Sequence, residues 1–288
     1  MTPSLLRPDQ SLRLVDICSP SAPARQAIIQ VEDLSIVFDA SSGQVIAVDR
    51  VSLVVAQGEF VSIVGPSGCG KSTLLNAMAG LERPFEGQVL IAGEAMHAPR
   101  PEIGMVFQQP HLFPWKSVRR NIAHGPRALG KPKAEALRIA DDLIEMIGLT
   151  RFASAYPHTL SGGMQQRVAI ARALANQPRV LLMDEPFGAL DAQTRAVMQD
   201  NLLELRERIN ATIVFVTHDI DEAILLSDRV LIMSAGPGRI LKDLQVSLPR
   251  PRSSAIVAEA AYLALKRDCL DLIRSEGRRA FEQMEIRT

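Results

Sequence analysis

The chain has 288 residues, and its 32 Lys and Arg residues balance its 32 Asp and Glu residues, so the formal net charge is zero. This length suits one large α/β domain with a small appendage. A chain with balanced charge does not attract nucleic acid electrostatically, so nucleic acid is not an expected partner. Cys18, Cys69 and Cys269 match neither a disulfide framework nor a zinc-ligand spacing, which favours a reducing compartment.

The two ends of the chain differ in composition from its middle. Residues 1–27 contain scattered prolines and serines, with no continuous apolar segment after a basic start, so they predict a poorly ordered tail and not a secretory signal. Residues 28–248 are predicted to form the main domain, and residues 249–288 a helical extension. The longest apolar runs have the length of strands and fall far short of the ~20 residues that a spanning helix needs.

The main domain is predicted to begin with antiparallel β structure. β-Branched and apolar residues recur in short runs over 28–31, 34–38 and 51–55, separated by Ser-Ser-Gly and Gln-Gly breaks. Phe60 to Val64 is then a nearly continuous apolar run, which leads through a glycine-rich turn into a helix-like stretch over 71–79. This is the pattern of a buried strand that enters an α/β unit.

The second half of the domain alternates between two kinds of pattern. Apolar residues at helical spacing over 133–147 predict a helical insertion, within about 110–178. After it, strand candidates alternate with helix candidates, which favours a mostly parallel sheet. The strand candidates are 180–183, 212–216 and 229–233, and the helix candidates are 163–175, 192–209 and 220–226. Residues 255–276 are predicted to form one or two closing helices.

The glycine-rich turn fits the pattern G-x-x-x-x-G-K-[ST] between a strand and a helix. Its residues are Gly65, Pro66, Ser67, Gly68, Cys69, Gly70, Lys71 and Ser72. Backbone N–H groups of such a loop surround phosphates, and the helix N-terminus adds a partial positive charge. Lys71 is expected to reach the β- and γ-phosphates, and the Ser72 hydroxyl to bind Mg²⁺. The alternative is an ordinary glycine-rich turn.

Two carboxylates follow the apolar run 180–183. Asp184 is expected to hold Mg²⁺ beside the phosphate loop, and Glu185 to polarise an attacking water. The alternative is that the two acids cap the next element or pair with surface cations. The phosphate loop upstream favours the catalytic interpretation.

A second helix start with anion-binding character lies at Leu160 to Arg167. Ser161 is expected to cap this helix, and Gly162 and Gly163 permit close approach of the backbone. One ATP molecule already has its phosphates held by the first loop. A second helix N-terminus that can bind phosphate therefore indicates a nucleotide held by another chain, and predicts a dimer.

Together with Gly65–Thr73 and Val180–Pro186, the segment Leu160–Arg167 resembles the motifs of the ABC-type ATPase family, and the resemblance extends over roughly residues 28–248. It implies the ABC ATPase fold, which is an α/β P-loop NTPase core with a mostly parallel sheet, an antiparallel β region and a helical insertion. It also implies ATP and Mg²⁺ as cofactors. Two ATP molecules would close a homodimer, each between the phosphate loop of one chain and the Ser161 segment of the other.

The family pattern adds further site residues. Gln108 resembles the Q-loop glutamine that senses Mg²⁺ and couples to the membrane subunit, and His218 resembles the switch histidine that contacts the γ-phosphate. Asp191 ends the D-loop, Gly188–Asp191, which touches the opposite protomer. Phe38 stands where the family stacks an aromatic residue on adenine, although a core position explains it nearly as well. Two more residues of the matched motifs are assigned to nucleotide binding, Thr73 and Gln165.

The sequences of several segments are typical of bacterial importers, and Ser234–Ile240 resembles the nitrate, sulfonate, taurine and bicarbonate branch. The resemblance implies a motor subunit on the cytoplasmic face of the inner membrane. Its partners would be separate membrane-spanning permease subunits and, indirectly, an extracytoplasmic solute-binding protein. The segment Pro110–Ile122, which holds the single tryptophan, Trp115, is the expected groove for a permease coupling helix. Packing of the helical insertion is the alternative.

Two other functions stay open. One is a soluble ABC ATPase that is not tied to transport, but such proteins usually carry two cassettes or a long coiled coil, and this chain has neither. The other is a regulatory module that binds ATP without turnover, which would be expected to lack the acid after Asp184 or the switch histidine. Because Glu185 and His218 are both present, catalysis by these two residues with Lys71 is the prediction.

Overall fold

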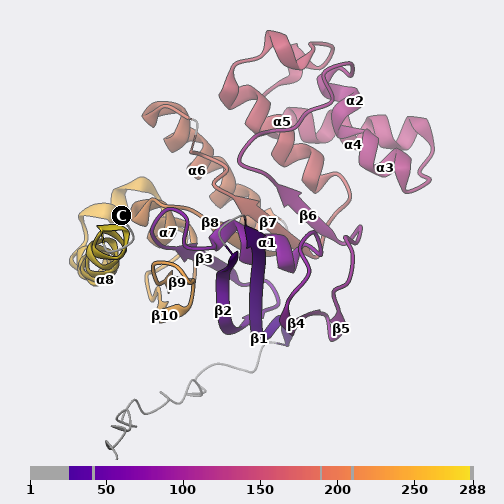
Figure 1. Cartoon of the computed structure of the whole chain (residues 1–288). Coiled ribbons are helices and arrows are strands. Elements are labelled where there is room, and N and C mark those ends of the chain that lie inside the picture. Colours follow the sequence, from indigo (N-terminus) through magenta and orange to yellow (C-terminus); the bar gives the residue numbers. More distant parts are fainter. Residues whose placement is uncertain (1–25, 41–42, 189, 209–210, 286–288) are drawn as a thin grey trace, which may run out of the picture.

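The computed structural model describes residues 26–40, 43–188, 190–208 and 211–285 (Figure 1). The predicted tail over residues 1–27 lies outside this part of the chain, apart from its last two residues. Among the described helices, none combines the length and the apolar character needed to span a bilayer.

A six-stranded sheet forms the centre of the fold, with the strand order β10-β9-β3-β8-β7-β6. All neighbouring pairs are parallel except β10 with β9, so the predicted mostly parallel sheet is confirmed. The strands are β3 (Phe60–Val64), β6 (Ile103–Val106), β7 (Val180–Asp184), β8 (Thr212–Val216), β9 (Arg229–Met233) and β10 (Ile240–Gln245). Every residue of β3 and β8 is buried, because helices and the second sheet cover both faces.

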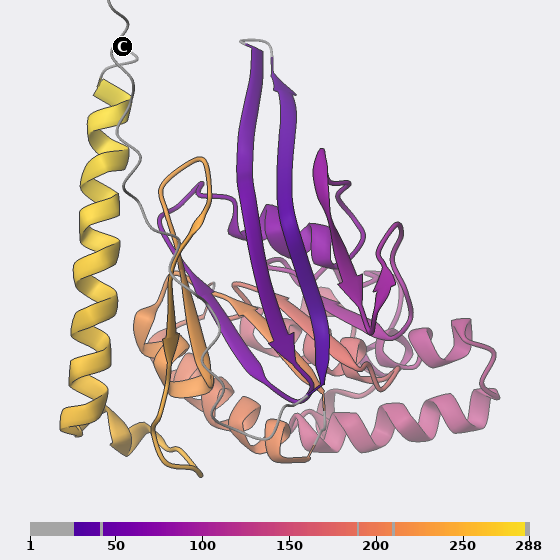
Figure 2. The ribbon, with the colours of Figure 1, turned by 90° about the horizontal axis from the view of Figure 1, so that it is seen from below.

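An antiparallel sheet lies beside the first, in the order β2-β1-β4-β5. Its strands are β1 (Ala27–Ala40), β2 (Gly43–Ala56), β4 (Glu86–Ile91) and β5 (Glu94–Ala95). The long β1–β2 hairpin extends well past the central sheet (Figure 2). This confirms the predicted antiparallel region, but β4 and β5 were not predicted from their mixed composition.

Helix α1 (Lys71–Met78) packs between the two sheets. Its residues Leu74, Leu75 and Met78 share one core cluster with side chains from both sheets. The other face of the central sheet is covered by α5 (Gly162–Leu174), α6 (Ala192–Arg208), α7 (Ile220–Leu226) and α8 (Ala260–Glu285). The phosphate loop is therefore anchored at the point where the two sheets meet.

The helical insertion has a core of its own, formed by α2, α4 and α5. Its elements are α2 (Val118–Ile122), α3 (His124–Ala128), α4 (Lys133–Met146), η1 (Thr150–Phe152) and η2 (Pro157–Thr159). Figure 1 shows this group on the opposite side of the central sheet from α8. The helix predicted over 133–147 is confirmed by α4, whereas the short helices α2 and α3 were missed.

The C-terminal region closes the core. It consists of η3 (Ser254–Ala258) and α8, as the sequence predicted for residues 255–276. Tyr262 and Cys269 of α8 are buried in the core cluster of the central sheet. One strand of the central sheet was not predicted from the sequence. Strand β10 follows the predicted strand 229–233, and its central charged residues hid its strand character in the sequence.

Candidate nucleotide-binding site

The phosphate loop connects β3 to α1, and its backbone requires glycine. Gly70 has a φ of 96°, and a Cβ atom there would lie 2.5 Å from the backbone oxygen of Ala47. Lys71 is buried, and its Nζ donates to the backbone oxygens of Gly65 at 2.9 Å and of Pro66 at 3.0 Å. The ammonium group is therefore held within the loop that would receive phosphates.

The remaining loop residues differ in exposure. Ser67 and Gly68 are exposed at the rim, Pro66 and Thr73 are half-buried, and Cys69 is buried. The Sγ of Cys69 lies 4.0 Å from Lys71 Nζ. Burial raises the pKa of the Cys69 thiol, so this side chain is neutral and structural in character.

Ser72 and Asp184 meet beside the phosphate loop. The Ser72 Oγ donates to Asp184 Oδ1 at 2.9 Å. Burial is the main cause that raises the pKa of Asp184, and the nearby Glu185 adds to it. The described residues contain no group of three or more His, Cys, Asp and Glu side chains that could hold a metal ion. Asp184 is half-buried, and a carboxylate in this environment would gain from a cation. The oxygen pair of Ser72 and Asp184 fits a Mg²⁺ ion that would take its other ligands from phosphates and water.

Glu185 connects two further predicted residues. Its Oε2 accepts from Gln108 Nε2 at 3.2 Å and lies 3.2 Å from His218 Nδ1. Glu185 has a φ of 41°, an uncommon conformation that is held by a hydrogen bond from its backbone N to Val216 O. Two side chains from different parts of the chain therefore converge on one carboxylate next to Asp184.

The sequence did not indicate how the segment after Gln108 is held. Arg172 of α5 donates to the backbone oxygens of His111 at 2.7 Å and of Pro110 at 3.0 Å. Gln166 adds a hydrogen bond to Phe107 O at 3.4 Å. No local signal marks Arg172, because it is one of two arginines in α5 and its role depends on a segment about sixty residues away.

The segment around Ser161 is placed apart from this cluster. The Ser161 hydroxyl caps α5 by accepting from Met164 N at 3.3 Å, as predicted. Gly162 is exposed, and Gly163 packs against Thr194. Gln165 uses its amide to bind the backbone oxygens of Pro157 and Leu160. In the described part of the chain, no hydrogen bond or ion pair joins these residues to the phosphate loop.

Two predicted residues lie outside the Glu185 cluster. Phe38 is 40% exposed on β1, which argues against the alternative that it fills the core. Asp191 accepts hydrogen bonds from the backbone N and the hydroxyl of Thr194, and these bonds lower the pKa of its carboxyl. The structure thus assigns Asp191 a local role at the start of α6. Ala189, in the same predicted loop, lies outside the described residues.

Comparison with solved structures supports the fold. The chain is similar to an ATP-binding cassette solved as a dimer in a post-hydrolysis state with ADP and Pi, with a TM-score of 0.69 and 34% identity. The match covers 77% of this chain and 100% of the other. The protein cbiO1 from Clostridium perfringens, part of the ABC transporter complex cbiONQ, matches with a TM-score of 0.68 and 30% identity over 76% of this chain and 89% of its own. The α/β P-loop fold is therefore confirmed.

Sequence comparison gives the family. The family described as ABC transporter matches residues 48–188. An uncharacterised ABC transporter ATP-binding protein of Methanocaldococcus jannaschii is 46% identical over 86% of this chain and 92% of its own length. The aliphatic sulfonates import ATP-binding protein SsuB of Bacillus cereus is 46% identical over 78% of this chain and 88% of its own length. The nitrate import ATP-binding protein NrtC of Synechocystis is 45% identical over 87% of this chain, and the match covers 38% of that longer protein. The chain is a member of the ABC transporter family, as an ATP-binding subunit.

Proposed function

We propose that the chain is the ATP-hydrolysing motor of an importer for a small anionic solute of the nitrate, bicarbonate, sulfonate or taurine type. The observation that carries this proposal is the meeting of Gln108 and His218 on Glu185, directly beside the Ser72–Asp184 pair. Relatives named as import proteins for nitrate, bicarbonate and aliphatic sulfonates support the solute class.

Each residue of the proposed site has its own role in hydrolysis. Lys71 and the loop backbone bind the β- and γ-phosphates, and Phe38 offers an exposed aromatic face for adenine. Ser72, Asp184 and Gln108 would hold Mg²⁺, which would supply charge neutralisation at the phosphates when bound. Glu185 orients and polarises the attacking water, and His218 contacts the transferred phosphoryl group.

The active form is a homodimer. Within one chain, no hydrogen bond or ion pair of the described residues joins the Ser161–Gly163 helix start to the phosphate loop, and Gly162 is exposed. The partner's nucleotide supplies the anion that this helix start can bind, as the family resemblance implies. The dimeric cassette with ADP and Pi supports this arrangement.

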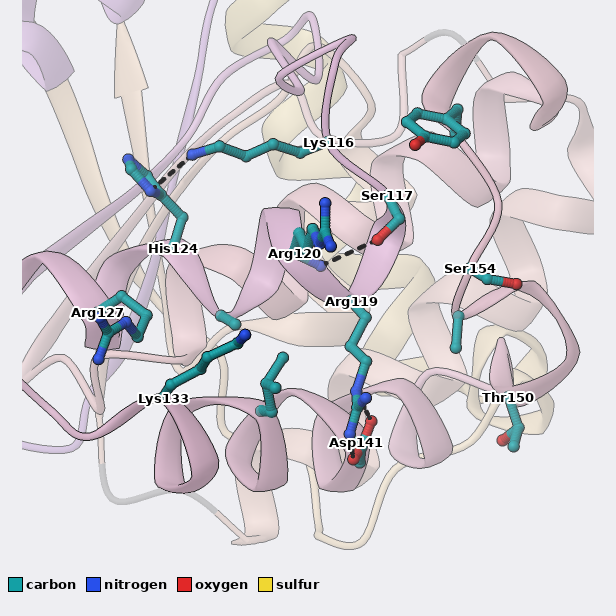
Figure 3. Close-up of a pocket in the computed structure, with 14 residues that line it drawn as sticks. Lys116, Ser117, Arg119, Arg120, His124, Arg127, Lys133, Asp141, Thr150 and Ser154 are labelled. Atoms are coloured by element: carbon teal, nitrogen blue, oxygen red, sulfur yellow. Dashed lines mark hydrogen bonds and ion pairs between the residues drawn. The ribbon is translucent and has the colours of Figure 1, made fainter.

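Membrane-spanning permease subunits would contact the helical insertion. A cavity of about 800 Å³ opens there, and Figure 3 shows side chains of the α2–α3 segment and of α4 facing into it. Lys116, Ser117 and Arg119 of the predicted groove segment line it, and the nearby Trp115 is 70% exposed. This exposure supports a docking role over pure packing. The subunit would then sit on the cytoplasmic face of the membrane, with a solute-binding protein on the other side.

Hydrolysis by the purified chain is the first test. Wild type should hydrolyse ATP only with Mg²⁺, and Glu185→Gln should retain ATP binding with little turnover and form an ATP-dependent dimer, as measured by light scattering. Glu145→Gln, an exposed acid on α4, is the matched control and should behave as wild type. Tight ATP binding without turnover in wild type, even with permease partners supplied, would favour the non-catalytic module.

Transport is tested separately. Cells that lack the chain should lose uptake of one radiolabelled solute among nitrate, bicarbonate, taurine and aliphatic sulfonates, and regain it with wild type but not with Glu185→Gln. Hydrolysis in vitro combined with normal uptake of all these solutes would favour the soluble ATPase.

A further inference from the structure

Arg195 lies in the first turn of α6, and its guanidinium contacts two separate segments of the site. Its Nη2 donates to the backbone oxygen of Leu190, in the D-loop, at 3.0 Å. Its Nη1 lies 3.6 Å from Asp219 Oδ2, and its Nε lies 3.6 Å from Glu222 Oε1. Both acids belong to the start of α7, which follows His218 directly.

Asp219 fixes the backbone on one side of His218. Its Oδ1 accepts from the backbone N of Asp221 at 2.8 Å and of Glu222 at 3.3 Å, so it caps α7. Its other oxygen, Oδ2, faces Arg195. A displacement of the Arg195 guanidinium therefore acts on the cap that sets where α7 begins.

Glu222 fixes the backbone on the other side. It is 4% exposed, and its Oε2 accepts from Thr217 Oγ1 at 2.6 Å. The same hydroxyl accepts from Asp219 N at 3.0 Å. Burial raises the pKa of Glu222, and Asp219 adds to this, whereas Thr217, Arg195 and Gln199 lower it. Of the two chain neighbours of His218, Thr217 is thus bonded to Glu222, and Asp219 itself faces Arg195.

We propose that Arg195 is a positioning residue that transmits the placement of the D-loop to His218. The proposal rests on the proposed role of His218 in hydrolysis. One rigid guanidinium with donors on three nitrogens can hold the Leu190 carbonyl and the two carboxylates in a fixed relation. When a second chain contacts the D-loop, its movement is passed to the turn that carries His218.

The contacts of Arg195 with Asp219 and Glu222 could become shorter. Both ion pairs, at 3.6 Å, are longer than hydrogen bonds, and the buried Nε of Arg195 has no hydrogen-bond partner among the described residues. A small shift of the D-loop toward α7 would bring these groups within bonding distance. The monomer therefore holds the network in an incomplete form, which dimer formation would complete.

The test compares Arg195→Met with Arg195→Lys, in wild type and in a His218→Ala background. Arg195→Met keeps an apolar chain about as long as the aliphatic part of arginine but removes the guanidinium and its three contacts, so kcat should fall about 10- to 100-fold while KM for MgATP changes little. Arg195→Lys retains the charge and should recover part of kcat. Arg138→Met is the control, because Arg138 makes an exposed ion pair on α4, remote from the site.

In the His218→Ala background, Arg195→Met should cause no further loss of single-turnover rate. A further loss of the same size would overturn the proposal, because Arg195 would then act independently of His218. Unchanged kcat in Arg195→Met would also overturn it. If His218→Ala itself leaves kcat unchanged, the proposed role of His218 fails first, and the inference fails with it.

A spectroscopic readout separates positioning from simple destabilisation. The chain has five histidines, and the ¹⁵N imidazole signals of His218 can be identified by their loss in His218→Ala. Arg195→Met should move these signals and leave those of the other histidines in place. Unmoved His218 signals alongside a lower unfolding midpoint would show a structural role only.

Discussion

Gln108 Nε2 and His218 Nδ1 lie at the same distance, 3.2 Å, from one oxygen atom, Oε2 of Glu185. Gln108 follows β6, Glu185 follows β7 and His218 follows β8, and these three strands are neighbours in a parallel sheet. The carboxyl ends of parallel strands share one edge, where ligands bind in folds of this kind. The sheet order therefore brings together residues that are 77 and 33 positions apart in the sequence.

Lys71→Ala should abolish most of the hydrolysis. Lys71 carries the only charged side chain of the loop that we propose binds the phosphates, and loss of such a group costs about 10²- to 10³-fold in kcat. Mg²⁺-dependent phosphate release checks this, with Lys133→Ala as control, because Lys133 is exposed and forms no ion pair within the described structure. Turnover near the wild-type rate in Lys71→Ala would refute the assignment of the phosphate loop.

Gly163→Ala should destabilise the fold, whereas Gly162→Ala should not. A Cβ at Gly163 would lie 2.7 Å from Thr194 Cγ2, but a Cβ at Gly162 would meet no atom within 4 Å. Overpacking of this kind costs about 1–3 kcal/mol. Urea unfolding without nucleotide measures the difference. Thr194→Ser removes the Cγ2 methyl and keeps the hydroxyl, so it should rescue Gly163→Ala, and failure of that rescue would contradict the packing argument.

Cys69 should react slowly with iodoacetamide at neutral pH. The thiol is buried and its pKa is raised, so the reactive thiolate is scarce at pH 7 and becomes more abundant as the pH rises. Peptide mass spectrometry after timed alkylation gives the rate as a function of pH, and unfolded protein in urea serves as the reference. ATP should slow the reaction further. Equal rates in folded and unfolded protein would contradict the buried placement.

Tyr262→Phe should lower the free energy of unfolding by about 0.5–1.5 kcal/mol. The hydroxyl of Tyr262 donates to Asp221 Oδ1 at 2.8 Å, from the first turns of α8 to α7. The other tyrosine, Tyr156, is exposed, and its hydroxyl makes no hydrogen bond in the described structure, so Tyr156→Phe is the matched control. Denaturant unfolding compares the two variants, and equal losses would exclude a special role for the α7–α8 bond.

The same tyrosine predicts a pH dependence. Burial, followed by the hydrogen bond to Asp221, raises the pKa of Tyr262 far above its ordinary value. The folded state therefore holds this proton more tightly than the unfolded state, so the contribution is fully present below the ordinary tyrosine pKa of about 10 and is lost as the pH rises beyond it. Absorbance at 295 nm in Tyr156→Phe follows Tyr262 alone. Ionisation near pH 10 in the folded protein would contradict the burial.

The sequence alone determined the elements whose residues carry a local physical constraint. The turn around Gly70 needs a positive φ, the run 60–64 is apolar on both faces, and Ser161 caps the helix that follows it. Each of these constraints acts within a few residues, so it can be read without the fold. Strands β4, β5 and β10 escaped prediction because pairing with a neighbour, and not their own composition, makes them strands.

Only the tertiary structure decided which side chains meet. Nothing near Arg172 or Arg195 in the sequence shows that the first holds the segment after Gln108 and the second joins Leu190 to Asp219 and Glu222. Such contacts depend on the order of the strands and on how the helices cross them. Hydrogen bonds form only between groups about 3 Å apart in space. The fold, and not the separation along the chain, therefore decides which partners a charged side chain can contact.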